Sequence, residues 1–174
     1  NRIKTMTSCL WMQFCEKHGL KAEMGNHRHK MIPWAVRYAG QIHTRTVKGA
    51  DGMTAWQRHK GGWRVYPRRA LWWGEKVQYV EGGGKMKPQL EGKFAPEGIF
   101  VGFVERTEEY IIMTPSGCIK TKDVHRMSPD AAVDPVLVTQ VIGKPWNMHP
   151  SMPRDAASED LPVRMVIEPS IPVG

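Results

Sequence analysis

The sequence between residues 98 and 127 contains GIFVGF (98–103), EYIIMTPSG (109–117) and IKTKDVHRM (119–127). These runs are rich in β-branched and aromatic residues, the types that favour strands. They predict strands at 99–104, 110–113, 118–121 and around Val124. The Pro115-Ser116-Gly117 tripeptide predicts a turn between two of these strands.

A fifth strand is predicted upstream, after a turn at Gly74. There Val77 and Tyr79 alternate with Lys76 and Gln78, which is the two-residue period of a strand with one buried face. Five short strands within about 55 residues fit a small closed or nearly closed barrel better than an open sheet with a bare edge.

The chain before this region has the period of helices. Ile3, Met6, Leu10 and Phe14 are spaced by three or four residues, so they predict a helix over 2–18. A second helix is predicted over about 32–45, with Pro33 in its first turn. Thr54 is a candidate N-cap for a short helix that runs through His59 and ends at Gly61.

Charge is distributed unevenly along the 174 residues. Residues 1–76 carry 15 basic and 4 acidic side chains, a net charge of +11, whereas residues 77–127 carry 7 of each. Residues 128–174 carry 3 basic and 6 acidic side chains, a net charge of −3. A strongly basic segment attracts polyanions, of which nucleic-acid backbones are the most common.

The remaining composition excludes other classes. Cys9, Cys15 and Cys118 form no disulfide framework, which is typical of a reducing, intracellular compartment. No apolar run approaches the roughly 18 residues that span a bilayer, so we predict no membrane partner. The chain begins at Asn1, inside the first predicted helix, so we expect a fragment or a processed product.

The order of these blocks resembles the end of Ty/copia-type retrotransposon integrases, within the Pol polyprotein. In that family a strand ending in glycine and an aromatic residue precedes a tyrosine-containing strand, a Pro/Gly turn and a final Asp-Val segment. The segments that carry the resemblance here are PWAVRYAGQIHTR (33–45), TAWQRHKG (54–61), GEKVQYV (74–80) and the three runs quoted first. In order and spacing the resemblance covers about residues 3–127.

The resemblance implies an α+β chain in three parts. Residues 1–62 would be the last helices of a ribonuclease H-like core, and residues 63–127 a five-stranded antiparallel barrel of the Src-homology-3 type. Residues 128–174 hold eight of the thirteen prolines, and we predict a Pro-rich linker or tail, mostly disordered. Within it, residues 136–142 are a candidate for a single turn or strand.

The resemblance also implies that catalysis lies outside this chain. The family transfers DNA strands with two Asp and one Glu that hold divalent metal, and its catalytic Glu precedes the first helix. Before residue 62 the chain offers only Glu16, Glu23 and Asp51, none of them at the end of a buried strand. We therefore predict no catalytic residue and no cofactor, with divalent metal expected only in the complete integrase core. Gln57 stands where the family usually has Glu, which we treat as a neutral variation.

The basic residues around the helices and the barrel are the candidate nucleic-acid-binding site. GGWRVYPRRALWWGEK (61–76) interleaves arginines with aromatic residues. Arginines neutralise phosphates, whereas Trp72 and Trp73 are better explained as packing residues. The candidate residues are Arg37, Arg45, Lys60, Arg64, Arg68, Arg69 and Lys76. The loop that follows the predicted strand with Val77 and Tyr79 contains Lys85, Lys87 and Lys93, which are either phosphate contacts or solvated side chains.

Other chemistry is less well supported by the residues. Cys15, His18, His27 and His29 could hold zinc, but their spacing matches no familiar zinc pattern, and a core cysteine with exposed histidines explains them better. We predict no metal site. The expected partner is DNA, either element ends or target duplex, with self-association of integrase and a nuclear location implied by the resemblance. The alternative function is a protein–protein interaction module built on the small barrel.

Overall fold

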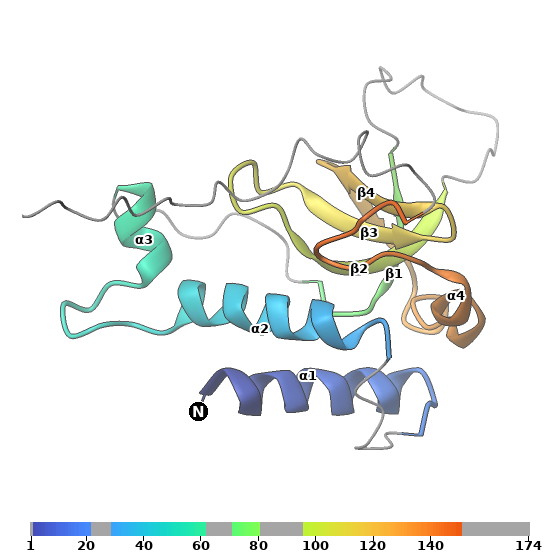
Figure 1. The fold of residues 1–174 in the computed structure, drawn as a ribbon, viewed down its shortest axis with the longest axis horizontal. Helices are drawn as coiled ribbons and strands as arrows, with labels where there is room; N and C mark the ends of the chain where they lie inside the picture. The colour runs from blue at the N-terminus through green and yellow to red at the C-terminus, as the bar shows by residue number, and fades with distance from the viewer. Residues whose placement is uncertain (1, 22–28, 62–70, 81–95, 151–174) are drawn as a thin grey trace, which may run out of the picture.

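The computed structural model describes residues 2–21, 29–61, 71–80 and 96–150. Two long helices, α1 (Arg2–Lys17) and α2 (Ile32–Thr46), lie side by side, and α2 lies between α1 and a β-sheet (Figure 1). The short helices α3 (Ala55–Lys60) and α4 (Pro135–Gln140) lie at opposite ends of the molecule (Figure 1). The predicted α+β class is confirmed.

The sheet has five antiparallel strands in the hydrogen-bonded order β4-β3-β2-β1-β5. Each strand begins and ends within two residues of its predicted position, because the apolar runs and the turn residues mark both ends. The strands are β1 (Lys76–Tyr79), β2 (Glu97–Phe103), β3 (Tyr110–Thr114), β4 (Gly117–Thr121) and β5 (Val124–Arg126).

The described strands form an open sheet, with β4 and β5 at its edges, where the sequence favoured a closed or nearly closed barrel. The edge of β4 is contacted instead by the chain after α4, which also bonds the end of β3. Cys118 N–H of β4 donates to Met148 O at 2.9 Å, and Ile142 N–H donates at 3.0 Å to the carbonyl of Thr114, the last residue of β3. A covering segment satisfies the backbone groups that barrel closure would otherwise satisfy.

The helices and the sheet bury one common hydrophobic cluster. Phe14 of α1 and Trp34 of α2 are fully buried in it, together with Val101 and Met113 of the strands. Trp73 is 2% exposed and its ring lies 5.2 Å from the Phe14 ring, which confirms its role as a packing residue. The predicted boundary at 62–63 lies outside the described residues, but the units on either side of it share this core.

The turn before β1 requires glycine. Gly74 has a φ of +86°, a conformation that residues with a side chain rarely adopt. A Cβ atom there would also collide with the Phe14 ring, so Gly74 lets α1 approach the sheet closely. Glu75, which follows, is fully buried and accepts two hydrogen bonds from Arg126 of β5, at 2.7 and 3.1 Å.

The predicted disordered tail is wrong for residues 128–150, which fold back onto the core. Val138 of α4 is 1% exposed and Val141 is fully buried. Trp34 Nε1–H donates to Gly143 O at 3.2 Å, which ties the segment to α2. Its prolines are compatible with order, since Pro135 lies in the first turn of α4, where a missing N–H costs nothing. Residues 151–174 lie outside the described residues.

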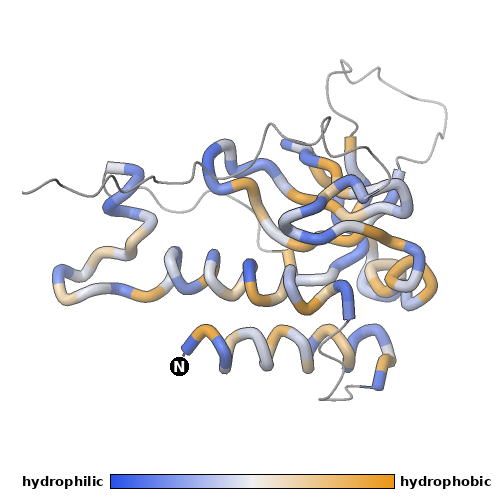
Figure 2. The backbone as a smooth tube through the Cα atoms, viewed as in Figure 1, coloured by the Kyte–Doolittle hydropathy of each residue, from blue (hydrophilic) through white to orange (hydrophobic). Residues whose placement is uncertain are grey.

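The colouring by hydropathy separates the two ends of the molecule. Figure 2 shows hydrophobic colours along the strands and α4, whereas α3 is mostly hydrophilic. None of the residues of α3 is buried. This helix is therefore held in place by polar contacts at its ends, and these contacts shape the candidate site.

Candidate functional site

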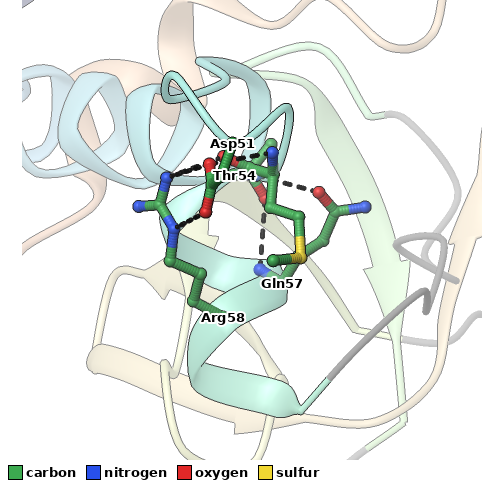
Figure 3. Close-up of polar contacts among 5 residues, drawn as sticks. Asp51, Thr54, Gln57 and Arg58 are labelled. Carbon is green, nitrogen blue, oxygen red and sulfur yellow. Dashed lines mark hydrogen bonds and ion pairs between the residues drawn. The ribbon is translucent and has the colours of Figure 1, made fainter.

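Helix α3 is fixed at its N-terminus by a capping box. Gln57 N–H donates to Thr54 Oγ1 at 3.1 Å, and Thr54 N–H donates in return to Gln57 Oε1 at 2.9 Å (Figure 3). Gly61 ends the helix in the left-handed conformation. Both ends were predicted from the sequence, and Gln57 supplies the same acceptor that a Glu would at this position.

A second clamp joins α3 to the loop that precedes it. Arg58 donates to both carboxylate oxygens of Asp51, at 2.7 and 2.6 Å (Figure 3). These hydrogen bonds hold the pKa of Asp51 well below its usual range. Arg58 therefore points toward the loop, and Asp51 is occupied in an ion pair.

A groove of about 700 Å³ lies between α2, α3 and the connection from β2 to β3. Four basic side chains and one acidic side chain line it. Three of the four basic residues are ones that the sequence predicted, Arg37, Arg45 and Lys60, and the fourth is Arg106. Residues far apart in the sequence thus contribute cations to one surface.

The two arginines of α2 are half-buried and rest on aromatic rings. Arg37 lies 5.7 Å from the centre of the Trp34 ring, and Arg45 lies 5.4 Å from that of Phe103. Burial lowers the pKa of Arg37 from its usual value, while the Glu105 carboxylate acts in the opposite direction. An arginine remains protonated under such a shift, so Arg37 keeps its charge.

The α3 side of the groove is joined to the β2–β3 connection through Glu108. Trp56 Nε1–H donates to Glu108 Oε1 at 3.1 Å, and Lys60 Nζ lies 3.8 Å from the same oxygen. The Lys60 side chain is 27% exposed and that of Glu108 is 14% exposed. Lys60 thus faces the groove with a carboxylate beside it.

Lys76 is the predicted site residue that the structure places elsewhere. It lies at the α4 end of the sheet, 3.0 Å from Asp134 and 3.3 Å from Glu97, and its side chain is 12% exposed. Burial acts to lower the pKa of Lys76, but the hydrogen bonds to the two carboxylates outweigh it and raise the pKa. Lys76 therefore lies outside the groove, in ion pairs with two carboxylates.

Comparisons of the chain with protein-family models, curated proteins and solved structures find no match. The remaining predicted arginines, Arg64, Arg68 and Arg69, lie outside the described residues, as do Lys85, Lys87 and Lys93.

The residues considered for zinc contact different parts of the fold. His18 is buried and bonds Gly74 O through Nε2 at 2.9 Å, whereas His29 packs on the Trp11 ring at 4.9 Å. Cys15 is buried, and burial raises the pKa of its thiol, which disfavours the thiolate that binds metal. Over the ranges that the structure describes, no three potential metal ligands are grouped. His27 lies outside those ranges.

The sequence reasoning missed three residues that line the groove, Arg106, Trp56 and Glu105, and also Glu108, which contacts Trp56 and Lys60 beside it. Arg106 and both acids belong to the run ERTEE (105–109), whose mixed charges resemble an ordinary solvated turn. The only available signal was the position of this run between two strands, which does not reveal which residues face it.

Among the helices that the structure describes, none has both the length and the apolar character needed to span a membrane.

Proposed function

We propose that this chain is a nucleic-acid-binding fragment of a Ty/copia-type retrotransposon integrase. Within a complete polyprotein it would contribute to DNA integration by gripping element ends or target duplex. The groove between α2, α3 and the β2–β3 connection is the proposed contact surface. Arg37, Arg45 and Arg106 bind phosphates there, and Lys60 can join them.

The charge of the groove is the observation that carries the proposal. Four basic residues against one acidic residue line a surface built from three separate elements. Cations gathered by folding, with their charge kept, are what a phosphate backbone requires, and such contacts supply most of the affinity of non-specific binding. Arg64, Arg68 and Arg69 follow α3 in the chain and remain candidates on the sequence alone.

The fold supports the same proposal at a coarser level. In the sheet, β5 pairs with β1 while β1 to β4 follow one another, which is the strand order expected of a Src-homology-3-like unit. We assign α1 and α2 to the end of a ribonuclease H-like core as part of the proposal. The resemblance in the blocks 33–45, 54–61 and 98–127 is what relates these elements to integrases.

No catalytic step is assigned to this chain. The family's metal ions need converging carboxylates, whereas Glu16 is exposed on α1 and Asp51 is held by Arg58. The residues that the structure describes before position 62 therefore do not fit a metal centre. The proposed contribution is binding and orientation of DNA.

Salt dependence tests the proposal directly. Binding of the full chain to a fluorescently labelled duplex is measured by anisotropy between 50 and 200 mM salt. Each phosphate contact contributes about −0.9 to the slope of log affinity against log salt. We expect a slope of about −3 from Arg37, Arg45 and Arg106 alone. A slope near zero would contradict the proposed function.

Single substitutions locate the surface. Arg37→Gln and Arg106→Gln should each reduce the magnitude of the slope by about 0.9 and weaken binding about eightfold at 0.1 M salt. Lys144→Gln is the matched control, since Lys144 is exposed and lies outside the groove. Equal effects of all three substitutions would indicate general attraction to a basic protein.

One feature favours the alternative function. Trp146 is 67% exposed in a tight turn, beside Lys144 at 5.7 Å, and an exposed tryptophan is typical of protein-binding surfaces. A protein-interaction module would lose partner binding on Trp146→Ala while the groove substitutions had no effect. The opposite pattern is expected from nucleic-acid binding.

A further inference from the structure

Glu108 has an unusual backbone conformation for a residue with a side chain. Its φ is +60°, in the left-handed region, and its N–H donates to Val104 O at 2.7 Å in the turn after β2. Glycine adopts this conformation with less strain, so the turn gains nothing from a glutamate as such. A side chain held in this conformation suggests that its carboxylate has a role.

The Glu108 side chain contacts two residues of α3. Its Oε1 atom accepts from Trp56 Nε1–H at 3.1 Å and lies 3.8 Å from Lys60 Nζ. Two donors on successive turns of one helix thus face a single carboxylate oxygen. An oxygen of a phosphodiester would satisfy the same two donors in the same way.

The neighbouring acids behave differently. Glu105 is exposed at the rim of the groove, and its charge acts on Arg37 from a distance. Glu109 accepts from the hydroxyl of Thr107 at 2.7 Å. Glu108 therefore differs from both in holding donors of α3.

We propose that Glu108 is an internal competitor for the nucleic-acid phosphate at Lys60 and Trp56. In the free protein its carboxylate takes the place of a phosphate and holds α3 against the β2–β3 turn. Nucleic acid binds by exchange: a phosphodiester oxygen replaces Glu108 Oε1, and the released carboxylate turns to solvent. This inference rests on the proposed function of the groove and adds how its affinity is set.

The exchange is balanced in charge and in hydrogen bonds. One anion replaces another beside Lys60, and the indole N–H of Trp56 keeps an acceptor in both states. A single phosphate ion therefore gains little by displacing Glu108. A chain of phosphates gains in addition at Arg37, Arg45 and Arg106, so Glu108 selects polymers over small anions.

Removing the charge of Glu108 while keeping its shape tests the proposal. Glu108→Gln retains an oxygen that can accept from Trp56 but frees the charge of Lys60. We expect this variant to bind a labelled DNA duplex about eightfold more tightly at 0.1 M salt, with a slope steeper by about 0.9. Inorganic phosphate should compete better against the variant than against the unmodified protein.

The neighbouring Glu109→Gln variant is the charge-matched control, because it removes the same charge one residue away. A general gain from lower negative charge would appear in both variants, whereas local competition changes only Glu108→Gln. Lys60→Gln should cancel the gain in the Glu108→Gln background and have a small effect alone. Thermal unfolding verifies that each variant is folded.

Each outcome decides one proposal or both. Steep salt dependence in the unmodified protein with no change in Glu108→Gln would overturn the competitor role and leave the proposed function standing. A gain shared equally by Glu109→Gln would also overturn it. If neither the protein nor Glu108→Gln binds duplex DNA, both proposals fail together.

Discussion

His18 links three elements through one imidazole ring. Its Nδ1 accepts from Asp134 N–H at 3.3 Å, which leaves Nε2–H to donate to Gly74 O at 2.9 Å. The ring is 2% exposed and lies between α1, the turn before β1 and the N-cap of α4. Burial lowers its pKa below the ordinary value, against the opposing effects of Gly74 O and Asp134, while Lys17 lowers it further.

This lowered pKa predicts that the protein loses stability in mild acid. Between the folded pKa and the ordinary value of 6.5, the unfolded chain binds a proton that the folded protein does not. The contribution of the His18 ring to the free energy of unfolding is therefore complete above about pH 6.5 and is lost as the pH falls below this value. Urea unfolding at intervals from pH 8 to pH 5 measures the free energy of unfolding.

His18→Gln supplies the reference for this measurement, since glutamine can accept and donate but does not titrate. The variant should be less stable than the unmodified protein at pH 8, and the difference between their free energies of unfolding should narrow as the pH falls below 6.5. A difference that stays constant over the whole range would mean that His18 does not control the pH dependence of stability.

The site residues show what charge patterning can and cannot predict. The excess of basic residues before position 77 led to Arg37, Arg45 and Lys60, which do line one groove. The same reasoning included Lys76, because nothing in the local sequence shows that Asp134, 58 residues later, forms an ion pair with it. Arg106 and Glu108 were missed for the same reason, since only folding brings their turn to α3.

At the scale of elements, α3 depends on its caps. It has six residues, none of them buried, so packing contributes little to its stability. Isolated helices of this length are not stable in water. The capping box and the clamp between Asp51 and Arg58 therefore stabilise the helix that carries Trp56 and Lys60.

Thr54→Ala should open α3 locally while leaving the rest of the fold intact. Loss of an N-cap costs about 1 kcal/mol, which corresponds to about fivefold faster amide exchange in the helix. The Arg58 N–H, which donates to Thr54 O at 3.1 Å, is the amide to follow by hydrogen exchange. The global free energy of unfolding should change by less than about 0.5 kcal/mol.

Thr46→Ala is the control, because the Thr46 hydroxyl bonds Ile42 O within α2 at 2.8 Å and caps nothing in α3. It should leave exchange in α3 unchanged. Equal protection of the Arg58 amide in both variants would show that the cap does not hold the helix.

The elements themselves were predictable because their signals are local. Apolar spacing gave α1 and α2, the Thr54 and Gly61 caps gave α3, and turn residues separated the strands. Helix α4 was not predicted, because proline content dominated the interpretation of its segment. Pro135 at the start of a helix and Asp134 as its N-cap are the signals that were overlooked.

At the scale of the molecule, one core joins parts that the sequence divided into three. Side chains of α1, α2, the strands and α4 meet in the same cluster. Contacts across such distances in the sequence have no local signature, so neither the shared core nor the covering of the β4 edge could be derived from patterns. The groove depends on this arrangement, since α2 carries two of its arginines and also packs on the sheet.

A pair of valines in α4 tests whether residues after 127 belong to the folded unit. Val138 is 1% exposed and lies in the common core, whereas Val136 is 63% exposed on the same helix. Val138→Ala removes two buried methyl groups and should lower the free energy of unfolding by about 2 kcal/mol. Val136→Ala makes the same chemical change at the surface, so urea unfolding should show a difference below about 0.5 kcal/mol. Equal, small effects of both substitutions would instead mean that α4 is not part of the core, and the predicted linker would then extend from residue 128.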